Sequence, residues 1–579
     1  MAKKQIYTFG NTTVRNTTRF PKGLRVLANS KFNGSINTKE DELGFAKELD
    51  TNDVTQMKKQ DDSSSGRKWR SAFDKLGFIT SASVRRNELQ NGEPDPLIME
   101  VKRKYPEIPL SGRASEVTPQ GQRMAQARNV YEMQDTVLRA LLAVQIESFD
   151  KEGQFFKPFV FTLQVMKALA DKGSKEGLNR SELLIVFSTS DHSKNGYIAD
   201  QILEYRKGRA KEKGKRAKGK YDRNFLSRFS KAVDVKYDSA ITYGDPNFKY
   251  MLGSGLFSRQ CSRLIFNQDK LPIIKQILKT EPHIITNKVD YYYQLWNGYP
   301  LPTDNRDVLI SEVQRLAKKT GVTLDQAQLG SVPELKQLRI RLEEKQSNYE
   351  EGIFAANQCM SENVDNIISY FRVINGEVKR GSEYDNARDD MPTFLEWATW
   401  RAFLAIDGLK NKPEEARGFQ VDQDFFPVGN APGGRPDITL EFKNYVLVVE
   451  VTLTSTSRQE AAEAEPVRRH VAQVQDLLHD KGKDKPVYGL FLAQTIDNNT
   501  AEMFRTGLWY NQNNPRFVNI VPMTITQFIH IMQEFQKYHF TNDELERLIE
   551  KCLIPRNATV TLWKDEIDTL VQKYELVKQ

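Results

Sequence analysis

The sequence predicts a multidomain α+β protein that is mostly helical in its first part and built on a mixed sheet in its last part. Its 579 residues exceed the usual length of a single domain. Apolar residues recur at helical spacing through much of the chain up to residue 375, and short β-branched runs follow later. We therefore expect a mostly helical region over residues 1–300, a helical linker over 301–390 and an α/β domain over 391–579.

Residues 1–300 combine predicted helices with small hairpins. A short helix is expected near Glu42–Leu49, and a later helix ends at Gly77 and is followed by a strand. Arg123–Ile146 is expected to form one long amphipathic helix. Short helices beside small hairpins are typical of winged-helix modules, which place one helix in a major groove. The other expected elements are helices at Phe155–Leu169, Ser181–Phe187 and Ala199–Arg206 and a hairpin at Phe257–Phe266.

Residues 301–579 are expected to change from helices to a sheet. Helical spacing continues over residues 302–375, and the charged, turn-rich segment Arg380–Asp390 marks a domain boundary. Beyond it the expected order is helix, hairpin, helix, strand and helix, which favours a mixed sheet with helices on its faces. After the hairpin we expect a helix at Val467–Leu478, strands at Pro486–Ala493 and Phe517–Pro522, and a helix at Thr526–Phe535.

Charge is distributed unevenly along the chain. Residues 1–300 contain 51 Lys and Arg against 34 Asp and Glu, whereas the remainder contains 33 against 42. A basic half joined to an acidic half indicates a polyanion-binding module tied to a different function. The simplest interpretation is that the basic half holds nucleic acid and the acidic half cuts it.

Composition argues against several classes of protein. No apolar run approaches the ~20 residues of a membrane helix, and the N-terminus lacks the apolar core of a signal peptide. We therefore expect a cytoplasmic protein without membrane contact. Cys261, Cys359 and Cys552 are widely spaced, fit a reducing compartment, and form neither a disulfide framework nor a zinc site. The chain has no G-x-x-x-x-G-K-[ST] loop, which argues against ATP-driven translocation.

The strongest concentration of positive charge is Arg206–Arg223, where ten of eighteen residues are basic and three glycines interrupt the run. Two interpretations stay open, a mobile solvated loop or a surface that contacts phosphates. Tyr221, Phe225 and Phe229 are expected in the core rather than stacked on bases. The candidate phosphate contacts in this run are Lys207, Arg209, Lys215 and Arg216.

A predicted hairpin brings two carboxylates together. Residues 435–442 alternate apolar and polar, residues 445–452 are almost wholly apolar, and Lys443-Asn444 supplies a two-residue turn. Asp437 then lies opposite Glu450, at the roughly 4.5–5.5 Å that separates the Cβ atoms of cross-strand neighbours. Carboxylates this close repel unless a cation lies between them, and Mg²⁺ suits such oxygen ligands. The alternative is an ordinary hairpin with two acids at its solvent end.

Two further acids are candidates for the same site, each with a simpler alternative. Glu396 lies in an apolar helix, where it either joins the site or forms a capping box with Thr393 as the N-cap. Glu463 either joins the site or is one solvated acid among several. Three candidate phosphate contacts follow: Arg468, Arg469 and His470. The alternative for the two arginines is a salt-bridged helix face. His470 could also carry protons, and its alternative is a packing or hydrogen-bonding histidine.

Four short segments carry a family resemblance: Phe394–Trp397, Ala431–Asp437, Val449–Thr452 and Glu463–His470. In this order they resemble the AlwI-type family of type IIS restriction endonucleases and related site-specific nicking endonucleases, within the PD-(D/E)xK nuclease superfamily. A weaker resemblance to the family's opening covers Val26–Asn29 and Phe45–Leu49.

The resemblance implies a two-part function. The N-terminal region would bind a short asymmetric duplex sequence, and the C-terminal domain would hydrolyse phosphodiester bonds a few nucleotides away with Mg²⁺. Asp437, Glu450 and Glu396 match the metal-binding acids, and Glu463 completes the catalytic set. Thr452 occupies the position of the superfamily's usual lysine, so another group must fill that role, with Glu463 as the candidate. Thr452 should face the same side of its strand as Glu450.

Several alternatives remain open at this level. The enzyme either cuts both strands or nicks one, as a monomer in solution that recruits a transient dimer partner or a second subunit for double-strand cleavage. The absent lysine motivates a DNA-binding protein with a catalytically degenerate nuclease domain. A repair or recombination nuclease that recognises DNA shape is the other alternative.

Overall fold

The computed structural model divides the chain into two compact units, Met1–Gln346 (unit 1) and Ser347–Gln579 (unit 2). The expected mixed α+β class is confirmed. The division falls inside the predicted linker, and the functional ranges 1–300, 301–390 and 391–579 stay predictions. The structure describes residues 7–573 apart from residues 11–13, 15–16, 53, 56–61, 83–92, 261–262, 326–329, 380–383, 385–386, 389, 423, 428, 432–433, 456–457, 484 and 512–513.

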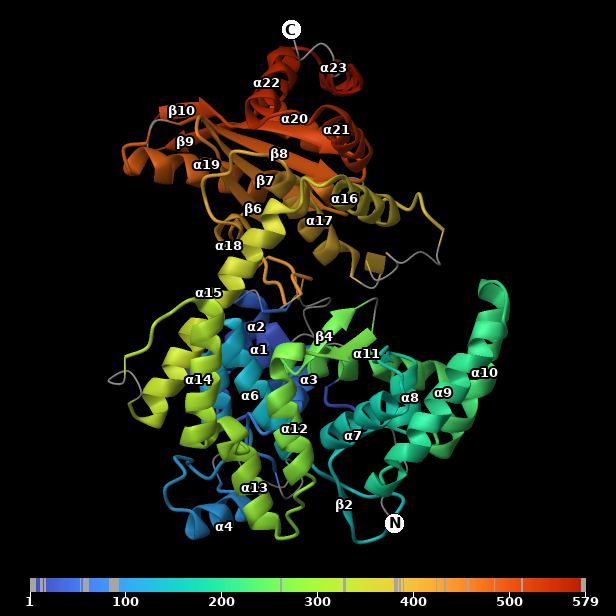
Figure 1. Ribbon diagram of the computed structural model, residues 1–579. Helices are drawn as coiled ribbons and strands as arrows, with labels where there is room; N and C mark the ends of the chain where they lie inside the picture. The colour runs from blue at the N-terminus through green and yellow to red at the C-terminus, as the bar shows by residue number, and fades with distance from the viewer. Residues whose placement is uncertain are drawn as a thin grey trace. The chain divides into compact units, whose positions relative to one another are not determined.

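Unit 1 is mostly helical and has its own large apolar core (Figure 1). Its helices are α1 (Phe20–Asn29), α2 (Lys39–Thr51), α3 (Ser64–Lys75), α4 (Pro96–Lys104), α5 (Pro119–Gln126), α6 (Val130–Ala143), α7 (Pro158–Asp171), α8 (Glu182–Val186), α9 (Asn195–Lys211), α10 (Lys215–Ala232), α11 (Tyr237–Gly253), α12 (Leu271–Thr280), α13 (Lys288–Asn297) and α14 (Arg306–Thr320). Its short strands are β1 (Ile146–Glu147), β2 (Phe155–Phe156), β3 (Leu178–Asn179), β4 (Phe257–Gln260) and β5 (Arg263–Phe266). Helix α15 (Val332–Ala356) begins in unit 1 and ends in unit 2.

Unit 1 agrees with the sequence prediction at one hairpin and departs from it at two other places. The hairpin at Phe257–Phe266 is present as antiparallel β4 and β5. The long helix expected over Arg123–Ile146 is instead two helices, α5 and α6. The side chain of Asn129 accepts hydrogen bonds from the next backbone N–H groups and so starts a new helix. The strand expected after Gly77 is reduced to one bridge between Ile79 and Val117.

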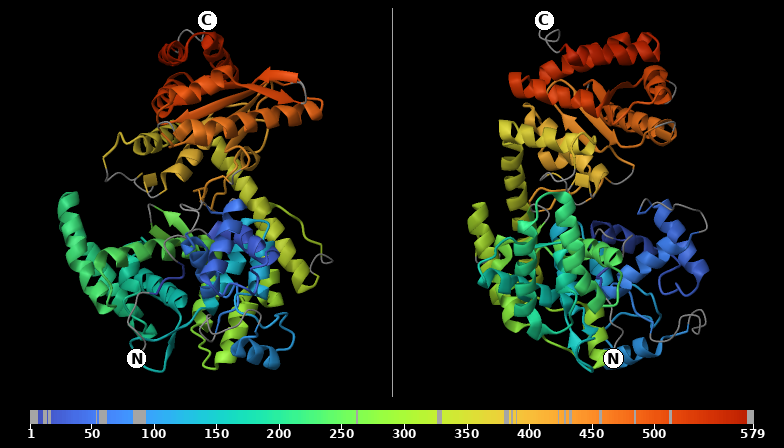
Figure 2. Two further views of the ribbon diagram at one scale, coloured as in Figure 1. Left: turned by 180° about the vertical axis from the view of Figure 1, so that it is seen from behind. Right: turned by 90° about the vertical axis from the view of Figure 1, so that its right-hand side faces the viewer.

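The basic run Arg206–Arg223 is helical except at residues 212–214, because α9 ends at Lys211 and α10 begins at Lys215. Of the two interpretations left open, a loop over the whole run is therefore wrong. Helices α9 and α10 lie side by side and extend away from the rest of unit 1 (Figure 1, Figure 2). The ring of Tyr205 stacks on Tyr221 and contacts Phe225, with centroids 6.0 and 5.3 Å apart. Gly208 permits this approach, because a Cβ atom there would lie 1.9 Å from the Tyr221 hydroxyl. Phe229 is buried, and Tyr221 and Phe225 are partly buried against the same core, so the expected packing of these three rings is confirmed.

Unit 2 contains a four-stranded mixed sheet with a separate core. Its helices after α15 are α16 (Ser361–Ile374), α17 (Met391–Ala405), α18 (Pro413–Ala416), α19 (Glu465–Asp480), α20 (Asn498–Thr506), α21 (Ile525–Tyr538), α22 (Asn542–Leu553) and α23 (Val560–Gln572). Its strands are β6 (Ile438–Glu441), β7 (Val446–Thr452), β8 (Val487–Ala493), β9 (Leu508–Asn511), β10 (Asn514–Phe517) and β11 (Asn519–Thr524). The sheet order is β11-β8-β7-β6. Strands β9 and β10 form a separate antiparallel ribbon that the sequence did not predict.

The predicted β6–β7 hairpin is confirmed in register. Ile438 pairs with Val449, and the N–H of Phe442 donates to the carbonyl of Tyr445 at 2.9 Å across the turn. The same register places Asp437 opposite Glu450. Strand β7 pairs in parallel with β8, so it lies in the interior of the sheet, as its apolar sequence requires. Helix α19 covers one face of the sheet, and α17 and α21 cover the other (Figure 2).

Two negative findings concern the described residues only. None of the helices in the described ranges is long and apolar enough to cross a membrane. Cys359 is exposed and Cys552 is buried, and both are free thiols. Cys261 lies outside the described residues.

Candidate active site

Asp437 stands at the edge of the sheet, directly before β6. Its carboxylate accepts a hydrogen bond from the backbone N–H of Val451 at 2.9 Å, which fixes the side chain beside β7. Burial raises the pKa of Asp437 well above its usual value, and the charge of Glu450 raises it further. The two acids of the hairpin therefore act on each other, as their opposed positions predict.

Glu450 lies on β7 and is 8% exposed. Burial raises its pKa, followed by the charges of Glu463 and Glu396, while Arg469 opposes the rise. One carboxylate oxygen lies 2.7 Å from Nδ1 of His470 on α19. His470 is itself buried, and burial followed by the charge of Arg469 lowers its pKa, which favours the neutral ring. Within the described part of the chain, the buried Nε2 of His470 has no hydrogen-bond partner.

Glu396 reaches the same site from α17, where it is 5% exposed. Its carboxylate accepts a hydrogen bond from the N–H of Ala431 at 2.7 Å, and burial and then the charge of Asp437 raise its pKa. The capping-box alternative is wrong, because α17 begins at Met391 and the N-cap is Asp390. Thr393 lies inside the helix and donates its hydroxyl to the side chain of Asn430.

Glu463 is oriented by two threonines. It belongs to a π-helical turn, Glu460–Ala464, that leads into α19. One of its carboxylate oxygens accepts hydrogen bonds from the hydroxyls of Thr452 at 2.8 Å and Thr454 at 3.1 Å. Thr452 and Glu450 thus contact the same helical segment, which confirms that both point to one face of β7. A hydroxyl donor therefore occupies position 452 beside Glu463.

Two residues that support the site, Thr454 and Gln459, were not predicted from the sequence. Gln459 is fully buried, and its amide donates to the carbonyls of Thr454 and Thr495 at 2.8 Å each. Its carbonyl oxygen accepts from the N–H of Asp497 at 2.9 Å. These bonds join the segment after β7 to the segment after β8. The alternation of Thr452 and Thr454 was a usable signal, whereas nothing local distinguishes Gln459 from a surface glutamine.

The donor set suits a hard cation. Four carboxylates come from three elements and one turn, and three of them have pKa values raised by burial and by one another. Such acids ionise together only when a positive charge offsets their repulsion. In the described ranges, no three or more Asp, Glu, His or Cys side chains are already arranged to hold a metal ion. The carboxylates instead accept the hydrogen bonds described above.

Comparison with known proteins places the chain in a family. A family model described as AlwI restriction endonuclease matches residues 75–531. The chain belongs to the AlwI restriction endonuclease family. No curated protein matches it. The small subunit of the heterodimeric restriction endonuclease R.BspD6I is similar, with 22% identity over 36% of this chain and 97% of that chain and a TM-score of 0.28.

In this AlwI-family chain, the predicted phosphate contacts near the four acids already have hydrogen-bond or ion-pair partners within the protein. Arg468 donates to the carbonyl of Leu508 at 2.6 Å, and Arg469 pairs with Glu465 at 3.2 Å on the same helix. The salt-bridged helix face is therefore present for Arg469, and the hydrogen-bonding alternative is present for His470. Phosphate contact by Arg468, Arg469 and His470 stays a prediction.

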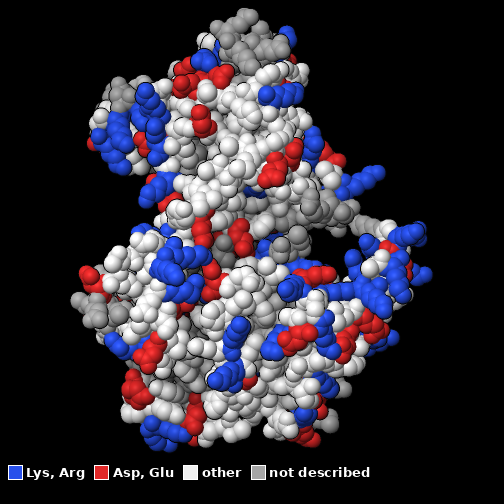
Figure 3. Space-filling view, in the orientation of Figure 1, with Lys and Arg blue, Asp and Glu red and all other residues white. Residues whose placement is uncertain are grey.

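The predicted phosphate contacts in unit 1 lie on the α9–α10 pair. Lys207 and Arg216 are exposed, and Arg209 pairs with Asp222 at 2.8 Å. The side chain of Lys215 lies outside the described part of the structure. Lys and Arg gather over the outer part of α9 and α10 in the space-filling view (Figure 3). Phosphate contact at this surface also stays a prediction.

Proposed function

We propose that the protein is a type IIS site-specific DNA endonuclease that requires Mg²⁺. The observation that carries this is the convergence of Asp437, Glu450, Glu396 and Glu463, three of them with strongly raised pKa values. Structural acids normally have cationic partners, whereas acids left to repel one another are typical of functional sites. Membership in a restriction endonuclease family supports the same class of reaction.

Asp437, Glu450 and Glu396 would hold the magnesium ion. When bound, it would lower the pKa of water and stabilise negative charge that develops on the phosphate. The backbone N–H groups of Val451 and Ala431 keep Asp437 and Glu396 in place. His470 would orient Glu450 through Nδ1, and its Nε2 is a buried polar atom without a hydrogen-bond partner among the described residues.

Glu463 would position the attacking water in place of the missing lysine. Both threonine hydroxyls donate to one of its oxygens, so the other oxygen is free to accept a proton from water. Thr452 therefore supports catalysis by orienting Glu463. The retention of all four acids argues against the catalytically degenerate alternative that the threonine raised.

Double-stranded DNA would be held mainly by the basic half of the chain. We assign recognition to residues 1–300, linkage to 301–390 and cleavage to 391–579. Lys207, Arg209, Lys215 and Arg216 in the first region and Arg468, Arg469 and His470 in the third would contact backbone phosphates, which bring affinity but no sequence information. Base contacts would come from other side chains of the N-terminal region.

Supercoiled plasmid DNA tests this function. Incubation with Mg²⁺ should give either open circles or linear molecules with ends at one fixed distance from one short sequence. Open circles alone mean strand-specific nicking by a monomer, whereas linear product means that a second active site, from a transient dimer or another subunit, has cut the other strand. Cleavage without sequence preference would contradict type IIS action and favour a nuclease that recognises DNA shape.

A further inference from the structure

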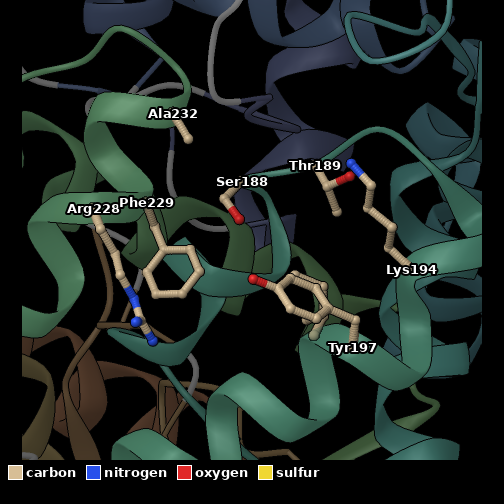
Figure 4. Close-up of a pocket in the computed structure, with 8 residues that line it drawn as sticks. Ser188, Thr189, Lys194, Tyr197, Arg228, Phe229 and Ala232 are labelled. Atoms are coloured by element: carbon tan, nitrogen blue, oxygen red, sulfur yellow. The ribbon is translucent and has the colours of Figure 1, made fainter.

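Unit 1 contains a cavity between the start of α9 and the end of α10 that the proposed cleavage chemistry does not use. Its volume is about 560 Å³, within the range of small-ligand pockets. It lies at the inner end of the basic α9–α10 pair, and Figure 4 shows its lining (Figure 4). The lining residues are Ser188, Thr189, Lys194, Tyr197, Ile198, Arg228, Phe229 and Ala232.

The walls of this cavity offer flat apolar surface. Tyr197 from α9 points its hydroxyl toward Ser188 and the ring of Phe229 from α10, and all three line the cavity (Figure 4). Tyr197 is 57% exposed, whereas Phe229 is buried. The buried ring of Phe229 and the accessible ring of Tyr197 suit a planar ligand, since exposed aromatic side chains stack on nucleobases.

The lining contains two cations, each paired with an acid outside the lining: Lys194 lies 3.4 Å from Asp150, and Arg228 lies 3.5 Å from Glu204. None of its eight described lining residues is acidic, and Lys194 and Arg228 lie at its edges. The guanidinium of Arg228 lies over the rings of Phe225 and Phe229, 3.9 and 4.8 Å from their centroids. A hydrogen bond to Gln201 at 2.7 Å further fixes Arg228. The cavity thus combines a flat apolar site with cations that an attached phosphate can reach.

Polar groups at the back of the cavity can recognise the edge of a base. Ser188 donates its hydroxyl to the carbonyl of Ile185 at 2.7 Å, and Thr189 donates to Asp150. The Thr189 oxygen also accepts from the N–H of Asp191 at 3.3 Å. The Ser188 oxygen, whose hydrogen is already used, is therefore the acceptor offered to the amino or imino groups of a base. Asp150 also lies 3.4 Å from Lys194, which holds that cation at the cavity edge.

We propose that this cavity binds one unstacked nucleotide, with the base packed against Tyr197 and Phe229 and a phosphate near Lys194 or Arg228. The inference rests on the proposed function, because DNA held on the basic α9–α10 pair would bring its backbone to the cavity. Arg216, Lys220 and Lys231 are exposed along α10, which continues past Arg228 at the cavity. The site would favour DNA in which one base is already out of the stack.

Binding of a duplex with a single unpaired nucleotide tests the cavity. Fluorescence anisotropy of the full chain in EDTA compares this bulged duplex with the same duplex fully paired, so that cleavage plays no part. We expect the bulged duplex to bind about tenfold more tightly, as stacking of one base on aromatic side chains allows. Tyr197→Ala should remove the preference, and Tyr197→Phe should keep it.

Tyr349→Ala is the matched control, since Tyr349 is a similarly exposed tyrosine, 70% exposed, on α15 and outside the cavity. It should keep the preference for the bulged duplex. Equal binding of both duplexes by the unmodified chain, or a preference unchanged in Tyr197→Ala, would overturn the proposal. As a second measurement, 5-iodouracil at the unpaired position should crosslink to Tyr197 or Phe229, and crosslinking confined to other residues would overturn it.

Adding free dAMP distinguishes a free nucleotide from a nucleotide within a DNA strand as the ligand of the cavity. Loss of the bulge preference in dAMP means that the cavity also takes free nucleotides, whereas an unchanged preference means that it takes them only within a strand; both outcomes support the site. Plasmid cleavage by the same preparation reports the proposed function separately. Cleavage without a bulge preference therefore contradicts the cavity alone.

Discussion

Asp135 in unit 1 and Glu450 in unit 2 are both carboxylates largely removed from water, but their neighbours differ. Asp135 accepts hydrogen bonds from Arg339 at 2.8 Å and Arg139 at 3.0 Å. Burial alone would raise the pKa of Asp135, yet the two guanidinium groups lower it to about 2. Burial and neighbouring acids raise the pKa of Glu450, and its close partner is the neutral His470.

The difference lies in the partners that each group of acids has. In unit 1 the network extends to Asp304, which binds Arg139 through two hydrogen bonds of 2.7 Å, so negative and positive charges are balanced inside the unit. In unit 2 the acids raise one another's pKa values, so they can all ionise only if a positive charge is added. Under the proposed function, a bound cation supplies that charge.

The largest expected effect is on the rate of DNA cleavage, when one carboxylate of the site is replaced by an amide. Asp437→Asn or Glu450→Gln should lower the rate of Mg²⁺-dependent plasmid cleavage by about a thousandfold or more, because a metal supplies several kcal/mol of transition-state stabilisation. DNA binding measured by electrophoretic mobility shift should be unchanged. Asp476→Asn is the control, since Asp476 lies on α19 like His470 but is paired with Arg516. Normal cleavage by either site variant would contradict the assignment.

The next effect concerns the balanced network in unit 1. Arg339→Met should lower the free energy of unfolding by about 1–3 kcal/mol, because the half-buried carboxylate of Asp135 loses one of its two arginine partners and keeps only Arg139. Denaturant titration followed by circular dichroism measures this change. Glu450→Gln should cost no stability in the metal-free protein, since it removes repulsion rather than a balanced charge. Equal losses in both variants would break the distinction between the two regions.

A smaller effect is expected at Thr452. Thr452→Val keeps the shape of the side chain but removes its hydrogen bond to Glu463, so kcat should fall about 10- to 100-fold, as for other residues that orient a site from behind. KM for DNA should stay the same. Thr454→Val removes the longer bond to the same oxygen and should cost less. If Thr454→Val is the more damaging variant, Thr452 is not the main support of Glu463.

The smallest effect is on the pH dependence of stability, where the two regions should respond in opposite directions. The folded-state pKa of Asp135 is about 2, below its unfolded value, so its contribution is lost as the pH falls from ~4 toward that value. The folded-state pKa of Glu450 is raised, so metal-free unit 2 loses stability as the pH rises above ~4 through the raised pKa. Hydrogen-exchange protection factors of peptides from each unit measure both trends.

The response of unit 2 has its own controls. Saturating Mg²⁺ or the Glu450→Gln substitution should remove the loss of protection at neutral pH. Loss of protection in unit 2 on acidification, with a gain on raising the pH, would mean that its carboxylates are balanced like those of unit 1.

Local patterns revealed the half of the site that lies in one hairpin. Alternation, a two-residue turn and a buried strand determine the pairing of Asp437 with Glu450, and all of these lie within residues 435–452. Glu396 was a candidate with a capping alternative, because its contact with Ala431 joins residues far apart in sequence. Tertiary contacts of this kind leave no periodic trace in one sequence.

The same limit explains the errors in the fold. The break between α5 and α6 depends on the side chain of Asn129 capping a helix, a choice that competes with an unbroken amphipathic pattern. The helical state of Arg206–Arg223 depends on rings of Tyr205 and Tyr221 that meet only once two helices pack. The β9–β10 ribbon is short and carries apolar side chains on an exposed face. Its sequence therefore lacks the alternation of apolar and polar residues that predicts a half-buried strand.

The π-helical turn before α19 makes the site depend on chain length as well as on residue type. It winds more residues into one turn than an α-helix does, and such bulges are frequent at functional sites. Deleting Ala462 would let this segment rewind as regular helix, turning what precedes it by about 100° around the axis. Glu463 could then no longer contact Thr452 while His470 contacts Glu450. The deletion would therefore inactivate the site although all four acids are still present.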